Sequence, residues 1–174
     1  MSFKKILVTG GAGYCGNVLV PALLKKGYEV VVYDIMYYGS QHLPLNNKNL
    51  SVIDGDIRDI KHLKSLLKDV DVFLHLACIS NDNSFELDEG LSTSINLDAF
   101  EPMVLAAKEA KCKRFIYASS SSVYGVSDAP EVFEDHPLVP LTLYNKYKGM
   151  CEPLLFKHTD KNFTGVIFRP ATVC

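Results

Sequence analysis

Residues 5–16 read Lys5-Ile-Leu-Val-Thr-Gly-Gly-Ala-Gly-Tyr-Cys-Gly16, and this stretch decides the fold. Its apolar start predicts a short strand, and from Tyr14 onward the apolar residues recur with a helical period. Between strand and helix, Gly10, Gly13 and Gly16 have the spacing G-x-x-G-x-x-G. Such a turn lets backbone N–H groups approach a pyrophosphate at the positive end of a helix dipole. Alone, the motif is equally consistent with an ordinary glycine-rich turn, so the rest of the chain must decide.

The rest of the chain alternates predicted strands and helices, without an internal repeat or a linker. Strands are expected at 28–34, 50–53, 70–76, 114–118 and 163–169, and helices at 60–68, 92–111 and 141–158. Strand 28–34 is almost continuously apolar, as in a parallel sheet that is buried on both faces. The pattern predicts one α/β domain, a doubly wound and mostly parallel Rossmann sheet with helices on both faces.

Two local features qualify these expectations. Residues 79–91 are polar and predict a long loop at the ligand-binding edge of the sheet. Pro21, Pro102 and Pro153 lie inside predicted helices, and each should kink its helix because it removes an intrahelical hydrogen bond. We keep the helices because the apolar period continues past each proline.

The composition excludes several classes of partner. The 174 residues carry a net charge of −2 with no basic run, which argues against nucleic acid or an anionic membrane as the main partner. No apolar stretch approaches the length of a membrane span. The five cysteines form no C-x-x-C and no metal-like cluster, so we expect reduced, buried thiols in a cytoplasmic protein, and no metal.

An acid stands where a dinucleotide site needs one. Asp34 ends the second strand about 20 residues past the glycine turn, as in the dinucleotide fingerprint. A carboxylate there can accept hydrogen bonds from both ribose hydroxyls of adenosine and would repel a 2′-phosphate. No Arg or Lys follows in residues 35–38, so NAD is favoured over NADP. The alternative is that Asp34 only ends a strand. His75, inside an apolar run, is expected to be a packed core histidine.

Tyr144 and Lys148 are four residues apart on a predicted helix and therefore share one face. A tyrosine in water has a pKa of about 10. A nearby ammonium favours the phenolate, a positively charged nicotinamide ring would favour it further, and together they can bring the tyrosine into the range of a general acid/base. Serines 119–122 follow strand 114–118 and offer hydroxyls that could bridge a substrate oxygen to that tyrosine. Each feature alone has an ordinary structural explanation, but their order and spacing form one consistent set.

The chain resembles the extended short-chain dehydrogenase/reductase family, in particular its NAD-dependent nucleotide-sugar epimerases and dehydratases. The segments that carry the resemblance are 9–16, Asp34, 55–59, 75–78, Asn96, 119–125, 144–148 and 169–170. The resemblance implies that the NAD pyrophosphate is surrounded by Gly10, Gly13, Tyr14, Cys15 and Gly16. It implies that Asp34 holds the adenosine ribose and that Asp56 and Ile57 flank the adenine. It also implies that Leu76 and Ala77 line the cofactor, that Asn96 supports it, and that Lys148 bonds the nicotinamide ribose.

The same resemblance implies an epimerase mechanism. Tyr144 removes a proton from a sugar hydroxyl while hydride passes to the nicotinamide, and hydride then returns to the other face of the keto sugar. Ser120, four residues before the Tyr of Val-Tyr-Gly, supplies the active hydroxyl. The family's dehydratases carry adjacent Asp and Glu after that hydroxyl, whereas this chain has Ser121 and Ser122, which disfavours elimination of water.

Alternatives to epimerisation are an NAD-dependent sugar reductase or dehydrogenase, and a cofactor-sensing relative without catalysis. The family also implies a nucleotide-sugar substrate and a homodimer through helices 92–111 and 141–158, although plain core packing would explain the same apolar faces. We expect residues 1–174 to be an NAD-binding Rossmann domain truncated before a C-terminal substrate-binding part, so that this part alone need not suffice for activity. Cys15 and Cys78 replace an aliphatic residue and an alanine of the family pattern, and both are small enough for binding to survive.

Overall fold

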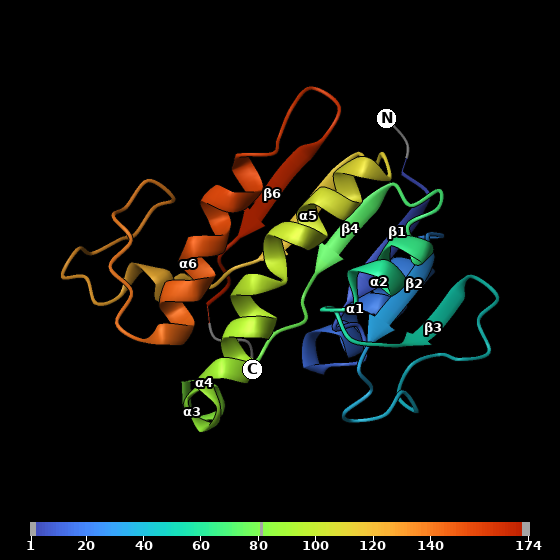
Figure 1. Ribbon diagram of the computed structural model, residues 1–174, viewed down its shortest axis with the longest axis horizontal. Coiled ribbons are helices and arrows are strands. Elements are labelled where there is room, and N and C mark those ends of the chain that lie inside the picture. The colour runs from blue at the N-terminus through green and yellow to red at the C-terminus, as the bar shows by residue number, and fades with distance from the viewer. Residues whose placement is uncertain (1–2, 81, 172–174) are drawn as a thin grey trace.

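A six-stranded parallel sheet organises the computed structural model, which describes residues 3–80 and 82–171 (Figure 1). The strands lie in the order β3-β2-β1-β4-β5-β6, and every neighbouring pair is parallel. Their bounds are Lys5–Thr9 (β1), Glu29–Asp34 (β2), Leu50–Asp54 (β3), Val72–His75 (β4), Arg114–Ala118 (β5) and Thr164–Phe168 (β6). The predicted Rossmann sheet is confirmed. Because the strand order reverses between β1 and β4, a ligand-binding crevice is expected at their carboxyl ends.

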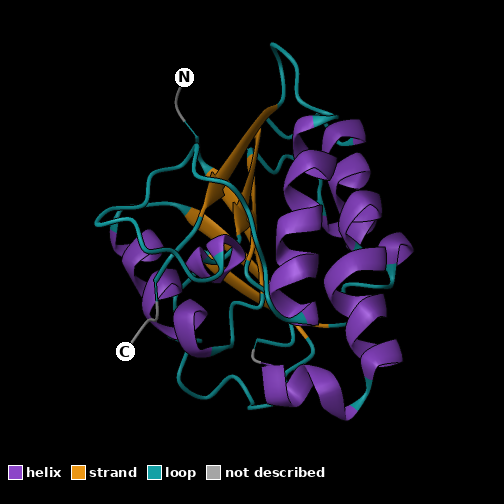
Figure 2. Ribbon diagram, turned by 90° about the vertical axis from the view of Figure 1, so that its left-hand side faces the viewer, coloured by secondary structure: helices purple, strands orange, loops and turns teal. Residues whose placement is uncertain are grey.

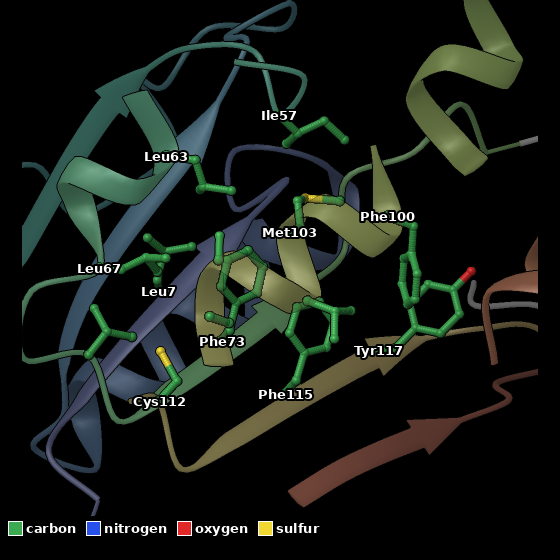
Figure 3. Packing of buried hydrophobic residues seen from close by; sticks show 14 of the residues in the cluster. Leu7, Ile57, Leu63, Leu67, Phe73, Phe100, Met103, Cys112, Phe115 and Tyr117 are labelled. Carbon is green, nitrogen blue, oxygen red and sulfur yellow. The ribbon is translucent and has the colours of Figure 1, made fainter. Parts of the chain in front are cut away.

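Helices cover both faces of the sheet (Figure 2). One face packs against α1 (Tyr14–Lys25), and the other against α2 (Ile60–Leu66), α5 (Phe100–Glu109) and α6 (Leu143–Phe156). Alternate strand residues supply the two cores, so that Ile6 and Val8 belong to the first and Leu7 to the second. Aromatic rings fill the second core (Figure 3), where Phe73 and Phe115 stack with ring centroids 4.7 Å apart.

The expected single helix 92–111 is wrong in detail. The chain forms α4 (Glu89–Thr93), a π-helical turn (Ser94–Asp98) and then α5. Pro102 has no N–H and its ring would crowd the carbonyl four residues earlier, which disfavours regular α-helix at that point. A wider turn resolves the conflict, and such π-turns are frequent at functional sites.

The expected polar loop 79–91 is also partly wrong, because it contains α3 (Asp82–Leu87) and the start of α4. Phe85 is fully buried and its ring packs 5.4 Å from the ring of Tyr147 on α6. This anchor explains why the segment folds despite its polar sequence. Pro21 and Pro153 lie inside α1 and α6, as expected, and the kink that each should cause stays a prediction.

The prediction of buried thiols holds only in part. Cys112 and Cys151 are buried, but Cys78 is half-buried and Cys15, in the first turn of α1, is exposed. Cys174 lies outside the described residues. Within residues 3–80 and 82–171 no group of His, Cys, Asp and Glu could hold a metal ion. In the same residues, no helix combines the length and apolar character that crossing a bilayer requires.

His75, at the end of β4, is buried as predicted, with 4% of its surface exposed. Its Nδ1 lies 2.7 Å from the Thr9 hydroxyl, and its ring stacks on Tyr117. Burial, with a smaller contribution from the Lys148 charge, lowers the His75 pKa to about 3. The imidazole is therefore neutral in the folded protein at all physiological pH values.

We expect this histidine to make the fold acid-sensitive. Below a pH of about 6.5, His75 is protonated in the unfolded chain but stays neutral in the folded chain. Its contribution should lower the free energy of unfolding by about 1.4 kcal/mol for each pH unit as the pH falls from about 6.5 toward 3. Denaturant unfolding of His75→Asn should show a correspondingly flatter pH dependence. Equal slopes for the two proteins would contradict the assignment, and measurements above pH 7 correct for the packing change.

Candidate active site

The glycine turn joins β1 to α1 at the centre of the sheet's carboxyl edge. Gly10 has a φ of +73°, and a Cβ built there would lie 2.5 Å from the backbone nitrogen of Ala77, so only glycine fits. A Cβ at Gly16 would meet the backbone of Gly11. Gly13 caps α1 without a side chain, which leaves the N–H groups of the first helical turn for a ligand. In that turn Tyr14 and Cys15 are exposed.

Asp34 is tied to this turn. One carboxylate oxygen accepts the N–H of Ala12 at 3.0 Å, and the other accepts the N–H of Met36 at 2.9 Å. His42, in the loop that follows β2, lies with Nε2 2.8 Å from the carbonyl oxygen of Ala12. The half-buried Asp34 carboxylate therefore stands beside the turn, where the sequence placed it.

Asp56 and Ile57 lie just beyond β3. The Asp56 carboxylate pairs with the Arg58 guanidinium, with Nε 3.0 Å from both oxygens, and these hydrogen bonds lower its pKa. Its backbone carbonyl accepts the hydroxyl of Tyr33 at 2.8 Å. The Ile57 side chain is buried in the larger core. Both the carboxylate and the backbone carbonyl of Asp56, the residue expected beside the adenine, are therefore already hydrogen-bonded within the protein, to Arg58 and to Tyr33.

Leu76 and Ala77 continue from β4 directly beside the glycine turn. Their N–H groups donate to the carbonyl oxygen of Thr9, at 3.0 and 3.1 Å. Asn96, in the π-turn, is buried and makes two hydrogen bonds with the backbone of Ile79, both at 2.9 Å. Its Oδ1 accepts the Ile79 N–H, and its Nδ2 donates to the Ile79 carbonyl. Asn96 therefore holds the segment that follows β4, which is consistent with a supporting role.

Tyr144 and Lys148 share one face of α6, as predicted. The Lys148 side chain is 5% exposed, and its Nζ donates to the Ala118 carbonyl at the end of β5 at 2.8 Å. The same ammonium lies 5.8 Å from the ring centroid of Tyr144 and 5.2 Å from that of Tyr117. One ammonium group is thus fixed between two phenol rings at the carboxyl edge of the sheet.

The surroundings of Tyr144 in the free protein oppose ionisation of its phenol. In the free protein the pKa of Tyr144 is raised, first by burial and then by the ionisable groups of Cys78 and Asp82. The ammonium of Lys148 alone therefore does not turn Tyr144 into a base at neutral pH. Ionisation of the phenol requires further positive charge or a hydrogen-bonding partner in the loaded site.

Ser120 caps the short 3₁₀ helix Ser121–Tyr124, and its hydroxyl accepts the N–H of Ser122 at 3.2 Å. The hydroxyl oxygens of Ser120 and Ser122 lie 2.6 Å apart, and Ser122 donates to the side-chain oxygen of Asn145 at 2.5 Å. Asn145 directly follows Tyr144, so the structure links residues 119–124, which we call the serine loop, to the helix of the tyrosine. The sequence analysis missed Asn145, although its position next to Tyr144 was a usable signal.

A buried ion pair that the sequence analysis also missed lies below this loop. Glu152, 4% exposed, receives two hydrogen bonds from Arg169, Nε to Oε1 at 3.0 Å and Nη2 to Oε2 at 2.6 Å. The hydroxyl of Ser119 donates to the same carboxylate at 2.6 Å, and Arg169 donates to the hydroxyl of Tyr124 at 2.6 Å. The pair thereby joins α6, the end of β6 and both ends of the serine loop.

Comparison with known proteins gives a consistent result. The model of the NAD dependent epimerase/dehydratase family matches residues 6–174. UDP-glucose 4-epimerase of Lactobacillus helveticus is 30% identical over 87% of this chain and 46% of its own length. Human dTDP-D-glucose 4,6-dehydratase is 30% identical over 98% of this chain and 51% of its own length.

Solved structures agree with these relatives. UDP-N-acetylglucosamine 4-epimerase from Methanobrevibacter ruminantium, in complex with UDP-N-acetylmuramic acid, superposes with a TM-score of 0.88 at 30% identity. The match covers 97% of this chain and 55% of that one. WbmG of Bordetella bronchiseptica, in complex with NAD, gives a TM-score of 0.82 at 27% identity, over 97% and 53% of the two chains. The chain thus spans about half the length of the proteins that it matches.

Proposed function

The chain belongs to the NAD-dependent epimerase/dehydratase family, and from that premise we propose that it forms the cofactor-binding and catalytic half of a nucleotide-sugar epimerase. The observation that carries the proposal is that Lys148 lies beside Tyr144 on α6, while Ser120 is linked through Ser122 to Asn145, the residue next to Tyr144. Ser121 and Ser122 stand where the resemblance places the acids of the dehydratases. Without carboxylates at those positions, elimination of water lacks its proton carriers. Decarboxylases and dehydratases are among the relatives, so the reaction itself needs a test.

NAD is the cofactor of this family, and the residues around the turn fit it. Gly10 and Gly16 let the turn pack closely against the backbone of Ala77 and of Gly11. The first turn of α1 offers N–H groups that no side chain caps, and Asp34 offers a carboxylate for ribose hydroxyls. The chemistry that NAD supplies when bound is reversible hydride transfer at a sugar carbon. Lys148, fixed by the Ala118 carbonyl, would bind the nicotinamide ribose.

Tyr144 acts in this proposal as the general base that takes the proton of the sugar hydroxyl and later returns it. Ser120 hydrogen-bonds the same sugar oxygen. The raised pKa of Tyr144 keeps the phenol protonated in the free protein, although Lys148 is already beside it. In the loaded site the positive charge of oxidised nicotinamide would add to that of Lys148 and favour the phenolate.

The experiment is a panel of UDP- and dTDP-sugars, incubated with the full-length protein and catalytic amounts of NAD. An epimer of unchanged mass without accumulation of NADH supports the proposal. A steady gain or loss of NADH would instead indicate a dehydrogenase or reductase, and a product lighter by one water a dehydratase. Binding of NAD without turnover of any sugar would favour a cofactor-sensing relative.

Asp34→Ala should weaken NAD binding by roughly 10- to 100-fold, because hydrogen bonds to a charged group contribute about 1.5–3 kcal/mol. NADP should lose less affinity, since the substitution also removes the repulsion of its 2′-phosphate. Titration calorimetry with both cofactors measures the two effects. Asp54→Ala is the matched control, because Asp54 is the exposed register partner of Asp34 on β3. Equal losses for NAD and NADP would contradict the ribose assignment.

A homodimer and residence in the cytoplasm are further parts of the proposal. Leu105 on α5 and Met150 and Phe156 on α6 are between 39% and 53% exposed, which leaves apolar surface on the two helices that the family uses. The buried faces of the same helices pack within the chain itself.

A further inference from the structure

A chain of three polar side chains runs from the serine loop to α6. Ser122 donates its hydroxyl hydrogen to the Oδ1 atom of Asn145 at 2.5 Å. The Oγ atoms of Ser120 and Ser122 are 2.6 Å apart, and the backbone N–H of Ser122 donates to the Oγ of Ser120 at 3.2 Å. Asn145 is only 8% exposed, so water competes little for its amide. We call these three residues the hydroxyl relay.

The hydroxyl relay has a direction, because each serine has one hydroxyl hydrogen. Ser122 donates its hydroxyl hydrogen to Asn145, so the hydrogen bond between the two serines must be donated by Ser120. The Ser120 oxygen also accepts the N–H of Ser122. Its position is therefore fixed from two sides, its hydrogen rests on Ser122, and one lone pair is left for a substrate.

Helix capping does not explain the side chain of Asn145. The start of α6 is capped by Thr142, whose hydroxyl accepts the backbone N–H of Asn145 at 3.3 Å. The ion pair of Glu152 binds Ser119 and leaves the hydroxyl of Ser120 to the relay. Within the described residues, the side-chain oxygen of Asn145 bonds the hydroxyl of Ser122.

We propose that Ser122 and Asn145 are positioning residues that act through Ser120. They fix the position of the Ser120 oxygen, and in the free site the Ser120 hydroxyl donates its hydrogen bond to Ser122. As negative charge develops on the sugar oxygen, the Ser120 hydroxyl rotates and donates to that oxygen instead. The exchange replaces a neutral hydrogen bond with a charge-assisted one, so it favours the transition state over the bound substrate. No covalent bond changes at either residue. The inference rests on the proposed function, since it takes Ser120 to contact the reacting oxygen.

Kinetics of single and double variants of the full-length protein test the relay. Ser122→Ala and Asn145→Ala should each lower kcat about tenfold, the effect of one hydrogen bond of about 1.4 kcal/mol, and change KM by less than about threefold. In a Ser120→Ala background the same substitutions should lower kcat by less than about twofold. Ser122→Thr keeps the hydroxyl and should retain most of the rate. Lys146→Ala, next to Asn145 but exposed, is the matched control.

Losses of kcat that are as large in the Ser120→Ala background as in the wild-type protein would overturn the proposal, as would unchanged kcat in both single variants. A wild-type protein that turns over no nucleotide sugar would refute the proposed function. The coupling within the relay would then be tested by the free energies of unfolding of single and double variants. The combined loss of stability in Ser120→Ala with Asn145→Ala should be smaller than the sum of the single losses. Strict additivity would show that the relay does not couple these residues.

Discussion

Tyr144→Phe should lower the turnover of a nucleotide sugar by about 10²- to 10⁴-fold, the usual contribution of a positioned general acid or base. The substitution removes one oxygen and keeps the ring, which packs against Phe85 and faces the ammonium of Lys148. The fold and the affinity for NAD should therefore change little. Steady-state kinetics and calorimetric titration with NAD measure the two quantities separately.

Tyr147→Phe is the matched control, because Tyr147 lies on the same helix and packs against the same phenylalanine. Its hydroxyl accepts a long hydrogen bond from Thr93, at 3.4 Å. We expect a change of less than about threefold in kcat. Comparable losses for the two variants would show that Tyr144 acts through packing, and undiminished turnover in Tyr144→Phe would refute the mechanism.

Arg169→Ala should cost about 3–5 kcal/mol of folding free energy, since it leaves the buried carboxylate of Glu152 without its partner. The same substitution frees the hydroxyl of Tyr124 from its 2.6 Å bond. Because Ser119 bonds Glu152, the serine loop should loosen as well. Denaturant unfolding of the full-length protein gives the free-energy difference.

Two controls separate burial from charge. Lys64→Ala breaks the pair of Lys64 with Glu109, whose side chains are about half exposed, and should cost less than about 1 kcal/mol. The double variant Glu152→Gln with Arg169→Met removes both charges and should be more stable than Arg169→Ala alone. If the exposed and the buried pair proved equally costly to break, the argument from desolvation would be wrong.

The local pattern of the sequence was sufficient to predict the sheet and the glycine turn between β1 and α1. Strand 28–34 is apolar at nearly every position because both of its faces are buried, and this signal does not depend on distant residues. Gly10 has a positive φ, a local requirement that the glycine motif reveals, whereas the close approach of Ala77 became visible only in the structure. The pairing of Tyr144 with Lys148 follows from helical spacing alone.

What the sequence did not predict depends on contacts between distant segments. The π-turn contains Asn96, which bonds Ile79, seventeen residues earlier. The helical periodicity of the sequence predicts neither the turn nor this bond. Glu152 lies four residues beyond Lys148 and so shares its helix face, but its partner Arg169 comes from the segment that follows β6. The raised pKa of Tyr144 comes from burial, which no spacing rule measures.

The most direct test of the account follows deuterium on the sugar carbon that is inverted, in a substrate identified from the panel. If the full-length protein epimerises by hydride transfer to bound NAD and back, mass spectrometry of the product epimer will find the deuterium retained on that carbon, with no net NADH formed. Deuterium lost to water would show inversion by removal of a proton from carbon, and would contradict the roles given to Tyr144, Ser120 and the cofactor turn.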